Sequence, residues 1–170
     1  MRNIAIIAIG MCLVLISACD KRNLPDKGAT YAESVSNEWW VVLSQNGSAL
    51  TDPAKISTYN TSMNQDSIFV DDLGNIWPFK CKAKIDLTNM AFSTEKTQSL
   101  TDIKVPGSSP AQYYRPTVTI TNGKILPKAA KSLSGNPTDS IYMEIEFSDD
   151  PGNKYVIAGS ARTRFSEDEY

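Results

Sequence analysis

With 170 residues, 41% of them hydrophobic, the chain is long enough for one domain with a sizeable core. A net charge of −2 and the lack of any run of Lys or Arg leave no electrostatic footprint for nucleic acid, so no nucleic-acid partner is expected. The chain contains no histidine, which removes the usual general base near neutral pH and the commonest metal ligand. We therefore expect neither a metal nor a cofactor.

Residues 1–18 are predicted to be a secretion signal. Arg2 supplies a basic start, and residues 4–16 form an apolar run that is shorter than the roughly twenty residues needed to span a bilayer. The segment ends Leu-Ile-Ser-Ala-Cys, which resembles the bacterial lipobox and implies acylation of Cys19, with palmitate among the acyl chains. An ordinary secretory leader with an incidental cysteine is the alternative. Residues 19–36 are polar and aperiodic, which predicts a lipidated, flexible tether.

Residues 37–170 are predicted to form a single β domain. Its first half has predicted strands at residues 38–43, 55–61, 67–70 and 76–87. The last of these is predicted to be the longest strand, and its alternation places Phe79 and Cys81 inward and a row of lysines outward. An inward Cys81 is expected to be an inert, small hydrophobic side chain, and as the only cysteine of the domain it has no disulfide partner there.

The second half of the domain is organised around a long hairpin at residues 138–165. Alternation in its first strand puts Ile141, Met143 and Ile145 on one face, and a turn rich in Asp, Pro, Gly and Asn follows. Upstream, Asn122-Gly123 predicts a two-residue hairpin of type I′. The other predicted segments are strands at 89–94, 115–121 and 124–126, an irregular insertion at 95–112 and a loop at 128–137.

No segment shows helical periodicity longer than two turns, so we expect eight to ten antiparallel strands without crossover helices. Such strands form either a sandwich or a closed barrel, and periodicity alone leaves both open.

Several motifs together resemble the lipid-binding putative hydrolase family of calycin-like bacterial lipoproteins. They are NEWWV from Asn37, GNIW from Gly74, NGKI from Asn122, TDSIYMEIEFSDDPGNKY from Thr138 and GSARTRF from Gly159. The resemblance implies an all-β, antiparallel, up-and-down lipocalin-like barrel of about eight strands on a lipid tether. Two positions depart from the expected pattern: Asn37 stands where a glycine is usual, and Ser160-Ala161-Arg162 replaces a bulkier basic stretch.

Motifs for catalysis are weak. There is no G-x-S-x-G and no histidine for a Ser-His-Asp arrangement. One S-x-x-K string, Ser93 to Lys96, needs a helix and partner motifs that the sequence lacks, so we interpret it as chance. The adjacent carboxylates Asp71/Asp72 and Asp149/Asp150 lie in predicted turns, where we expect them to be solvated with ordinary pKa values rather than to do acid–base work or bind Ca²⁺. The sequence therefore predicts no catalytic residue, and enzyme activity stays open.

Inward side chains of the barrel are the candidate ligand contacts, although ordinary core packing explains such residues equally well. Arg162 and Arg164 on the last strand are predicted to cover Trp39 on the first, a structural stack at the floor of a closed barrel. The candidate ligand-binding residues are Trp39, Val41, Phe79, Cys81, Ile141, Met143 and Ile145.

The leading functional hypothesis is a monomeric lipoprotein, anchored in the bacterial cell envelope at the outer membrane, facing the periplasm or the exterior. Its barrel would bind an apolar or amphipathic, lipid-like molecule without transforming it. The alternatives are a hydrolase acting on lipid or ester, and a surface module that binds glycan or protein through exposed aromatics.

Overall fold

The computed structural model describes residues 28–62 and 66–170. The predicted leader, the acylation site at Cys19 and most of the predicted tether lie outside the described residues. The described chain is almost entirely β-structure, with two short 3₁₀ turns, η1 (Glu33–Val35) and η2 (Ser166–Asp168).

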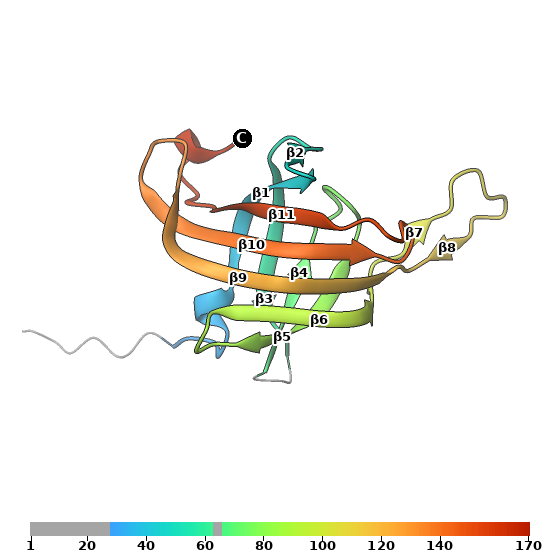
Figure 1. The fold of residues 1–170 in the computed structure, drawn as a ribbon, viewed down its shortest axis with the longest axis horizontal. Coiled ribbons are helices and arrows are strands. Elements are labelled where there is room, and N and C mark those ends of the chain that lie inside the picture. Colours follow the sequence, from blue (N-terminus) through green and yellow to red (C-terminus); the bar gives the residue numbers. More distant parts are fainter. Residues whose placement is uncertain (1–27, 63–65) are drawn as a thin grey trace, which may run out of the picture.

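Eight antiparallel strands form a closed barrel (Figure 1), and the first and last of them, β1 and β11, pair with each other. This pairing, from Trp39↔Ala161 to Ser44↔Val156, excludes the sandwich and confirms the predicted all-β barrel. A two-residue strand, β2 (Ser48–Ala49), folds back on the end of β1. In order around the wall the strands are β1 (Asn37–Gln45), β3 (Ala54–Asn60), β4 (Ser67–Asp71), β5 (Lys80–Asp86), β6 (Ala91–Gln98), β9 (Thr117–Lys131), β10 (Pro137–Phe147) and β11 (Tyr155–Ala161).

The predicted hairpin at Asn122-Gly123 is wrong, because β9 runs through it without turning and is the longest strand. Asn122 does adopt a positive φ of 52°, but it does so in a bulge where Asn122 and Gly123 together face Met143 of β10. Gly123 is required by space: a Cβ there would lie 2.3 Å from the carbonyl oxygen of Phe92 and 2.7 Å from its ring. The Asn-Gly pair thus bends a strand instead of ending one.

Other strand boundaries also differ from the prediction. β5 begins at Lys80 rather than at residue 76, because residues 72–79 form a loop. Residues 95–98, predicted to be irregular, extend β6, and residues 128–131 extend β9. The predicted hairpin at residues 138–165 is confirmed as β10 and β11, with the turn between Phe147 and Tyr155.

Alternation along the strands assigns the faces as predicted, with apolar side chains inside and polar ones outside. The inward set includes Ile56, Ile68, Val70, Ala83, Ile120, Ile125 and Ile157, none of them more than 1% exposed. Side chains therefore fill the middle of the barrel to the density of an ordinary protein core.

Both ends of the barrel are closed. At the tether end, where β1 begins, η1 places Val35 in the core, and the Thr58 hydroxyl donates a hydrogen bond to the Val35 carbonyl at 2.7 Å. At the opposite, aromatic end, Trp77 stacks on Phe147 with ring centroids 4.6 Å apart, and Phe79 and Tyr155 pack around Phe147. Among the described residues, packed side chains therefore cover both ends of the barrel.

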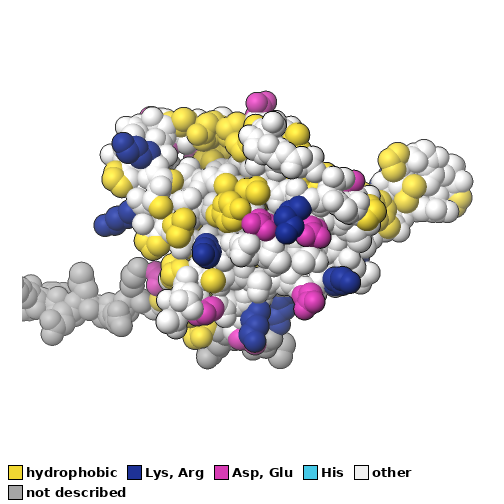
Figure 2. All heavy atoms as spheres, in the orientation of Figure 1, with side chains coloured by type: hydrophobic (Ala, Val, Ile, Leu, Met, Phe, Trp, Pro, Cys, Tyr) yellow, Lys and Arg dark blue, Asp and Glu magenta, His cyan; other side chains and the backbone are white. Residues whose placement is uncertain are grey.

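An arm projects from the aromatic end, built on a ribbon of β7 (Ile103–Lys104) and β8 (Tyr113–Tyr114) (Figure 1). Hydrophobic side chains lie exposed along it (Figure 2), including Leu100 and Tyr113. Arg115 pairs with Asp102 at 2.6 Å at its base. The visible barrel face in Figure 2 carries acidic and basic side chains interspersed, without an area of one sign.

Candidate ligand-binding site

The structure brings all seven predicted ligand contacts together in the barrel interior. Trp39 and Val41 come from β1, Phe79 from the loop directly before β5, Cys81 from β5, and the remaining three from β10. None of the seven is more than 1% exposed, so they pack against one another and their neighbours without space for a ligand beside them. Their inward orientation is as expected, and contact with a ligand stays a prediction. The three contacts from β10 are Ile141, Met143 and Ile145.

Cys81 is buried at the centre of this interior. Burial, with a smaller contribution from the negative charge of Asp71, raises the pKa of its thiol to about 12. The thiolate is the reactive form of cysteine, so Cys81 acts here as a small apolar side chain.

Asp72 holds the loop that closes the aromatic end. Its two carboxylate oxygens accept the Ile76 N–H at 3.0 and 3.2 Å, and its own N–H donates to the Phe79 carbonyl at 3.0 Å. The loop carries Trp77, whose indole N–H donates to Asp149 at 3.3 Å. Asp72 thereby fixes the aromatic side chains over the barrel.

The prediction that the turn carboxylates stay solvated is wrong for Asp72, which is fully buried. Burial raises the pKa of this carboxyl from 3.8 to about 6, against the opposing effect of backbone N–H groups from residues 74–77. The sequence shows only two adjacent aspartates in a turn, and the conformation of the turn decides which way each side chain points. Asp71 faces outward to Tyr59 and Lys80, whereas Asp72 faces in.

Acidification is expected to stabilise the domain through Asp72. A carboxyl whose pKa is raised by folding contributes stability that is complete below its unfolded pKa and is lost as the pH rises through its folded pKa. Between pH 7 and pH 4 the wild type should therefore gain about 2–3 kcal/mol of unfolding free energy relative to Asp72→Asn. Denaturant unfolding of both proteins across this range measures the difference. A relative loss on acidification would mean that the four N–H groups keep Asp72 ionised.

Arg162 and Arg164 follow the end of β11 rather than lying within the last strand, and their contacts are with carboxylates. Arg162 bridges Glu38 at 2.7 Å and Glu169 at 2.6 Å, and Arg164 approaches Glu38 at 3.4 Å. The predicted stack on Trp39 is not observed, because the Trp39 ring points into the barrel, where its N–H donates to the Thr58 hydroxyl at 2.9 Å. The hydrogen bond from Arg162 lowers the pKa of Glu38, so ion pairs with the two arginines hold together the seam, the contact between β1 and β11.

The wall of the barrel is weakest between β5 and β6. Only three registered pairs join these strands, from Lys84↔Ser93 to Asp86↔Ala91. The chain after β6 returns to β5 where the Leu100 N–H donates to the Lys80 carbonyl at 2.8 Å. Between these points β6 turns toward β9 through two register shifts.

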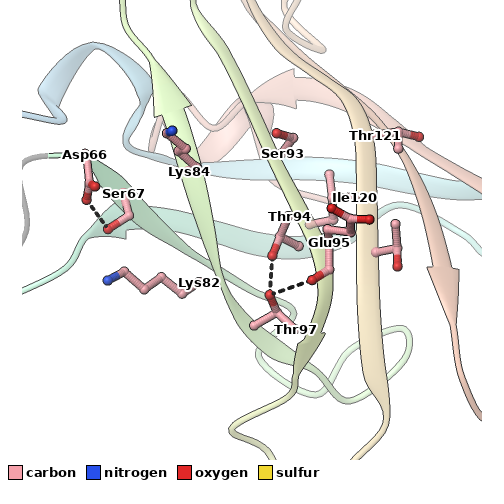
Figure 3. Close-up of a pocket in the computed structure, with 11 residues that line it drawn as sticks. Asp66, Ser67, Lys82, Lys84, Ser93, Thr94, Glu95, Thr97, Ile120 and Thr121 are labelled. Atoms are coloured by element: carbon pink, nitrogen blue, oxygen red, sulfur yellow. Dashed lines mark hydrogen bonds between the residues drawn. The ribbon is translucent and has the colours of Figure 1, made fainter.

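A cavity of about 680 Å³ opens at this divergence (Figure 3), and we call it the β5–β6 cleft. Ile120 of β9, a fully buried member of the core, is its one aliphatic lining residue, so the apolar interior begins directly beneath the cleft. The other lining residues are Asp66, Ser67, Lys82, Lys84, Ser93, Thr94, Glu95, Thr97, Thr119 and Thr121.

The S-x-x-K string lies beside this cleft, in a strand. Ser93 lines the cleft, but a strand does not give Ser93 and Lys96 the shared helical face that the motif needs. The residue registered opposite Ser93 is Lys84, which is exposed, whereas lysine acts as a base when burial or a neighbouring charge lowers its pKa.

Sequence reasoning missed the cleft. The available signal was the run from Ser93 to Thr97, which is too polar and too rich in hydroxyls for the alternation seen in the other strands.

Residues 24–166 match the family described as lipid-binding putative hydrolase, and the chain belongs to this family. No match was found among curated proteins. Within residues 28–62 and 66–170, no helix has the length and apolarity needed to cross a membrane.

Proposed function

We propose that this protein is a monomeric, lipid-anchored lipoprotein of the bacterial cell envelope whose barrel binds an amphipathic, lipid-like molecule without transforming it. Membership of a lipid-binding family and a barrel with an apolar interior support the ligand class. The observation that carries the proposal is the β5–β6 cleft, a polar depression whose one aliphatic lining residue, Ile120, belongs to the core.

The acyl part of the ligand would pass through the wall and not through an end. Both ends are sealed by packed side chains, whereas β5 and β6 share three registered pairs. The interior is full, so an acyl chain must displace side chains such as Met143, whose unbranched thioether adapts to new shapes at low cost. Burial of some ten CH₂ groups supplies about 8 kcal/mol against that repacking.

The anchor would be acylated Cys19, at the outer membrane. Residue 28 lies at the tether end of the barrel and the arm at the other end (Figure 1). The chain would therefore leave the barrel toward its anchor from the end opposite the arm.

The experiment has two parts. Cys19→Ser should move the protein from the membrane fraction to the soluble fraction, and retention through an alkaline wash would contradict the anchor. The released Cys19→Ser protein should bind a fluorescent fatty acid saturably with micromolar affinity, about −8 kcal/mol, and should not turn over a short-chain ester.

Absence of a saturable signal would overturn lipid binding. Ester turnover would contradict the binding-only function, and Ser93→Ala would then decide whether the Ser93–Lys84 pair is responsible. The matched control is Ser160→Ala, a serine on the outside of the barrel at the β1–β11 seam.

A further inference from the structure

We propose that the β5–β6 cleft binds a zwitterionic headgroup that carries a phosphate and an ammonium group, as in a phosphoethanolamine amphiphile. The inference rests on the proposed lipid-binding function and names the polar part of its ligand.

Opposite charges line the two sides of the cleft. Lys82 and Lys84 are successive outward residues of β5, and Glu95 belongs to β6 (Figure 3). Asp66, directly before β4, also lines the cleft, so Lys82, Lys84 and Asp66 together carry one net positive charge. A ligand that spans the cleft therefore meets ammonium groups on one side and a carboxylate on the other.

Lys84 and Glu95 do not neutralise each other. Among the ion pairs of residues 28–62 and 66–170, none includes Lys84 or Glu95, and in Figure 3 the two side chains do not point toward one another. Elsewhere on the surface neighbouring charges do pair, as Lys154 does with Glu144 and Glu146. The separation of Lys84 from Glu95 leaves both available to a ligand with complementary charges.

Hydroxyl groups occupy the rest of the lining. Thr94 and Thr97 share a hydrogen bond between their hydroxyls, and Ser93 and Thr119 also line the cleft. Hydroxyls donate to phosphate oxygens and accept from an ammonium group, so they fit both halves of such a headgroup. The volume of about 680 Å³ is within the usual range for a small-ligand pocket.

A purely anionic headgroup fits less well. It would use Lys82 and Lys84 but would leave Glu95 facing a like charge, which disfavours binding. A neutral sugar headgroup would use the hydroxyls and neither set of charges. The zwitterionic headgroup can contact the lysines, Glu95 and the hydroxyls. Comparison with headgroups that lack the ammonium group tests whether Glu95 takes part.

The test compares dodecyl phosphoethanolamine, dodecyl phosphate and dodecyl maltoside, which share the same alkyl chain, by titration calorimetry with the full chain carrying Cys19→Ser. The phosphoethanolamine should bind about tenfold more tightly than the other two. Lys84→Glu should weaken both phosphate compounds, whereas Glu95→Lys should weaken the phosphoethanolamine and strengthen dodecyl phosphate. The exchange Lys84→Glu/Glu95→Lys should restore part of the phosphoethanolamine affinity.

Lys131→Glu and Glu167→Lys are the matched controls, because they make the same charge changes at exposed residues outside the cleft. Equal binding of the three compounds, unchanged by the cleft variants, would overturn the headgroup assignment and leave lipid binding standing. If Glu95→Lys had no effect, the cleft would be a simple anion site, and the zwitterionic headgroup assignment would also be overturned. Failure of all three compounds to bind would overturn the proposed function itself.

If a variant does not fold, a second measurement tests the proposal with the cleft residues unaltered. Glycerophosphoethanolamine, which has no acyl chain, should shift the amide resonances of residues 82–84 and 93–97 in the Cys19→Ser protein, and glycerol phosphate should shift them less. Equal shifts with both compounds would contradict recognition of the ammonium group.

Discussion

Gly159→Ala is expected to destabilise the barrel by about 3 kcal/mol or more, because it forces apart the seam between β1 and β11. A Cβ at this position would lie 1.9 Å from the Trp40 carbonyl oxygen and 2.7 Å from the Val41 Cα. Both obstacles are backbone atoms, so no side-chain rotation relieves the overlap. Denaturant unfolding followed by tryptophan fluorescence measures the loss.

Ser160→Ala is the control for this seam, since Ser160 is the next residue of β11 and pairs with Trp40 on the outside of the barrel. It should change stability by less than about 0.5 kcal/mol. A Gly159→Ala protein as stable as the wild type would show that β11 does not approach β1 this closely in solution.

Trp39→Ala is expected to cost about 3–5 kcal/mol, the usual range for removal of a large aromatic side chain from a core. Trp39 is 1% exposed and links the tether end to the barrel, because its N–H donates to the Thr58 hydroxyl, which itself donates to the Val35 carbonyl. Calorimetric melting of the variant measures the loss. A cost below about 1 kcal/mol would contradict the packed interior.

A pair of phenylalanine variants separates packing from hydrogen bonding. Trp39→Phe keeps most of the ring and loses the bond to Thr58, so it should cost about 1–3 kcal/mol. The Trp40 indole nitrogen is buried and has no hydrogen-bond partner among the described residues, so Trp40→Phe removes an unsatisfied donor and should be close to neutral. Equal costs for the two substitutions would contradict this assignment of the donors.

The alternation of side chains was sufficient to predict which residues face inward. Ile141, Met143 and Ile145 are inside as expected, because burial of one sheet face imposes a period of two on any strand. The local sequence was not sufficient to predict the structure at Asn122-Gly123. A hairpin and a bulge both need a residue with positive φ followed by a small one, and the choice depends on whether β10 is available to pair on both sides of the bulge.

The cleft could not be predicted for a related reason. It exists because β6 shifts register against β9 at Thr94 and Thr97 and so leaves β5, and these pairings join residues far apart in sequence. The buried position of Asp72 likewise depends on the fold of a loop whose sequence only marks it as a turn. In both cases polar residues that a local pattern assigns to the surface are placed by long-range contacts.

The most direct measurement of lateral ligand access uses a disulfide across β5 and β6. Lys84→Cys/Ser93→Cys places two thiols at registered partners, which lie about 4.5–5.5 Å apart in antiparallel sheets and so suit a disulfide. In a Cys12→Ser/Cys19→Ser background, the remaining native cysteine, Cys81, is buried and should not interfere. The control pair, Val42→Cys/Ala158→Cys, pins β1 to β11 on the outside of the barrel.

Stopped-flow association of a fluorescent fatty acid is compared between the oxidised and reduced forms of each pair, so that loss of Lys84 affects both forms equally. Oxidation of the β5–β6 pair should slow association about tenfold or more, because the strands can no longer separate, while oxidation of the control pair should leave the rate unchanged. An unchanged rate with the β5–β6 disulfide formed would contradict access through the cleft.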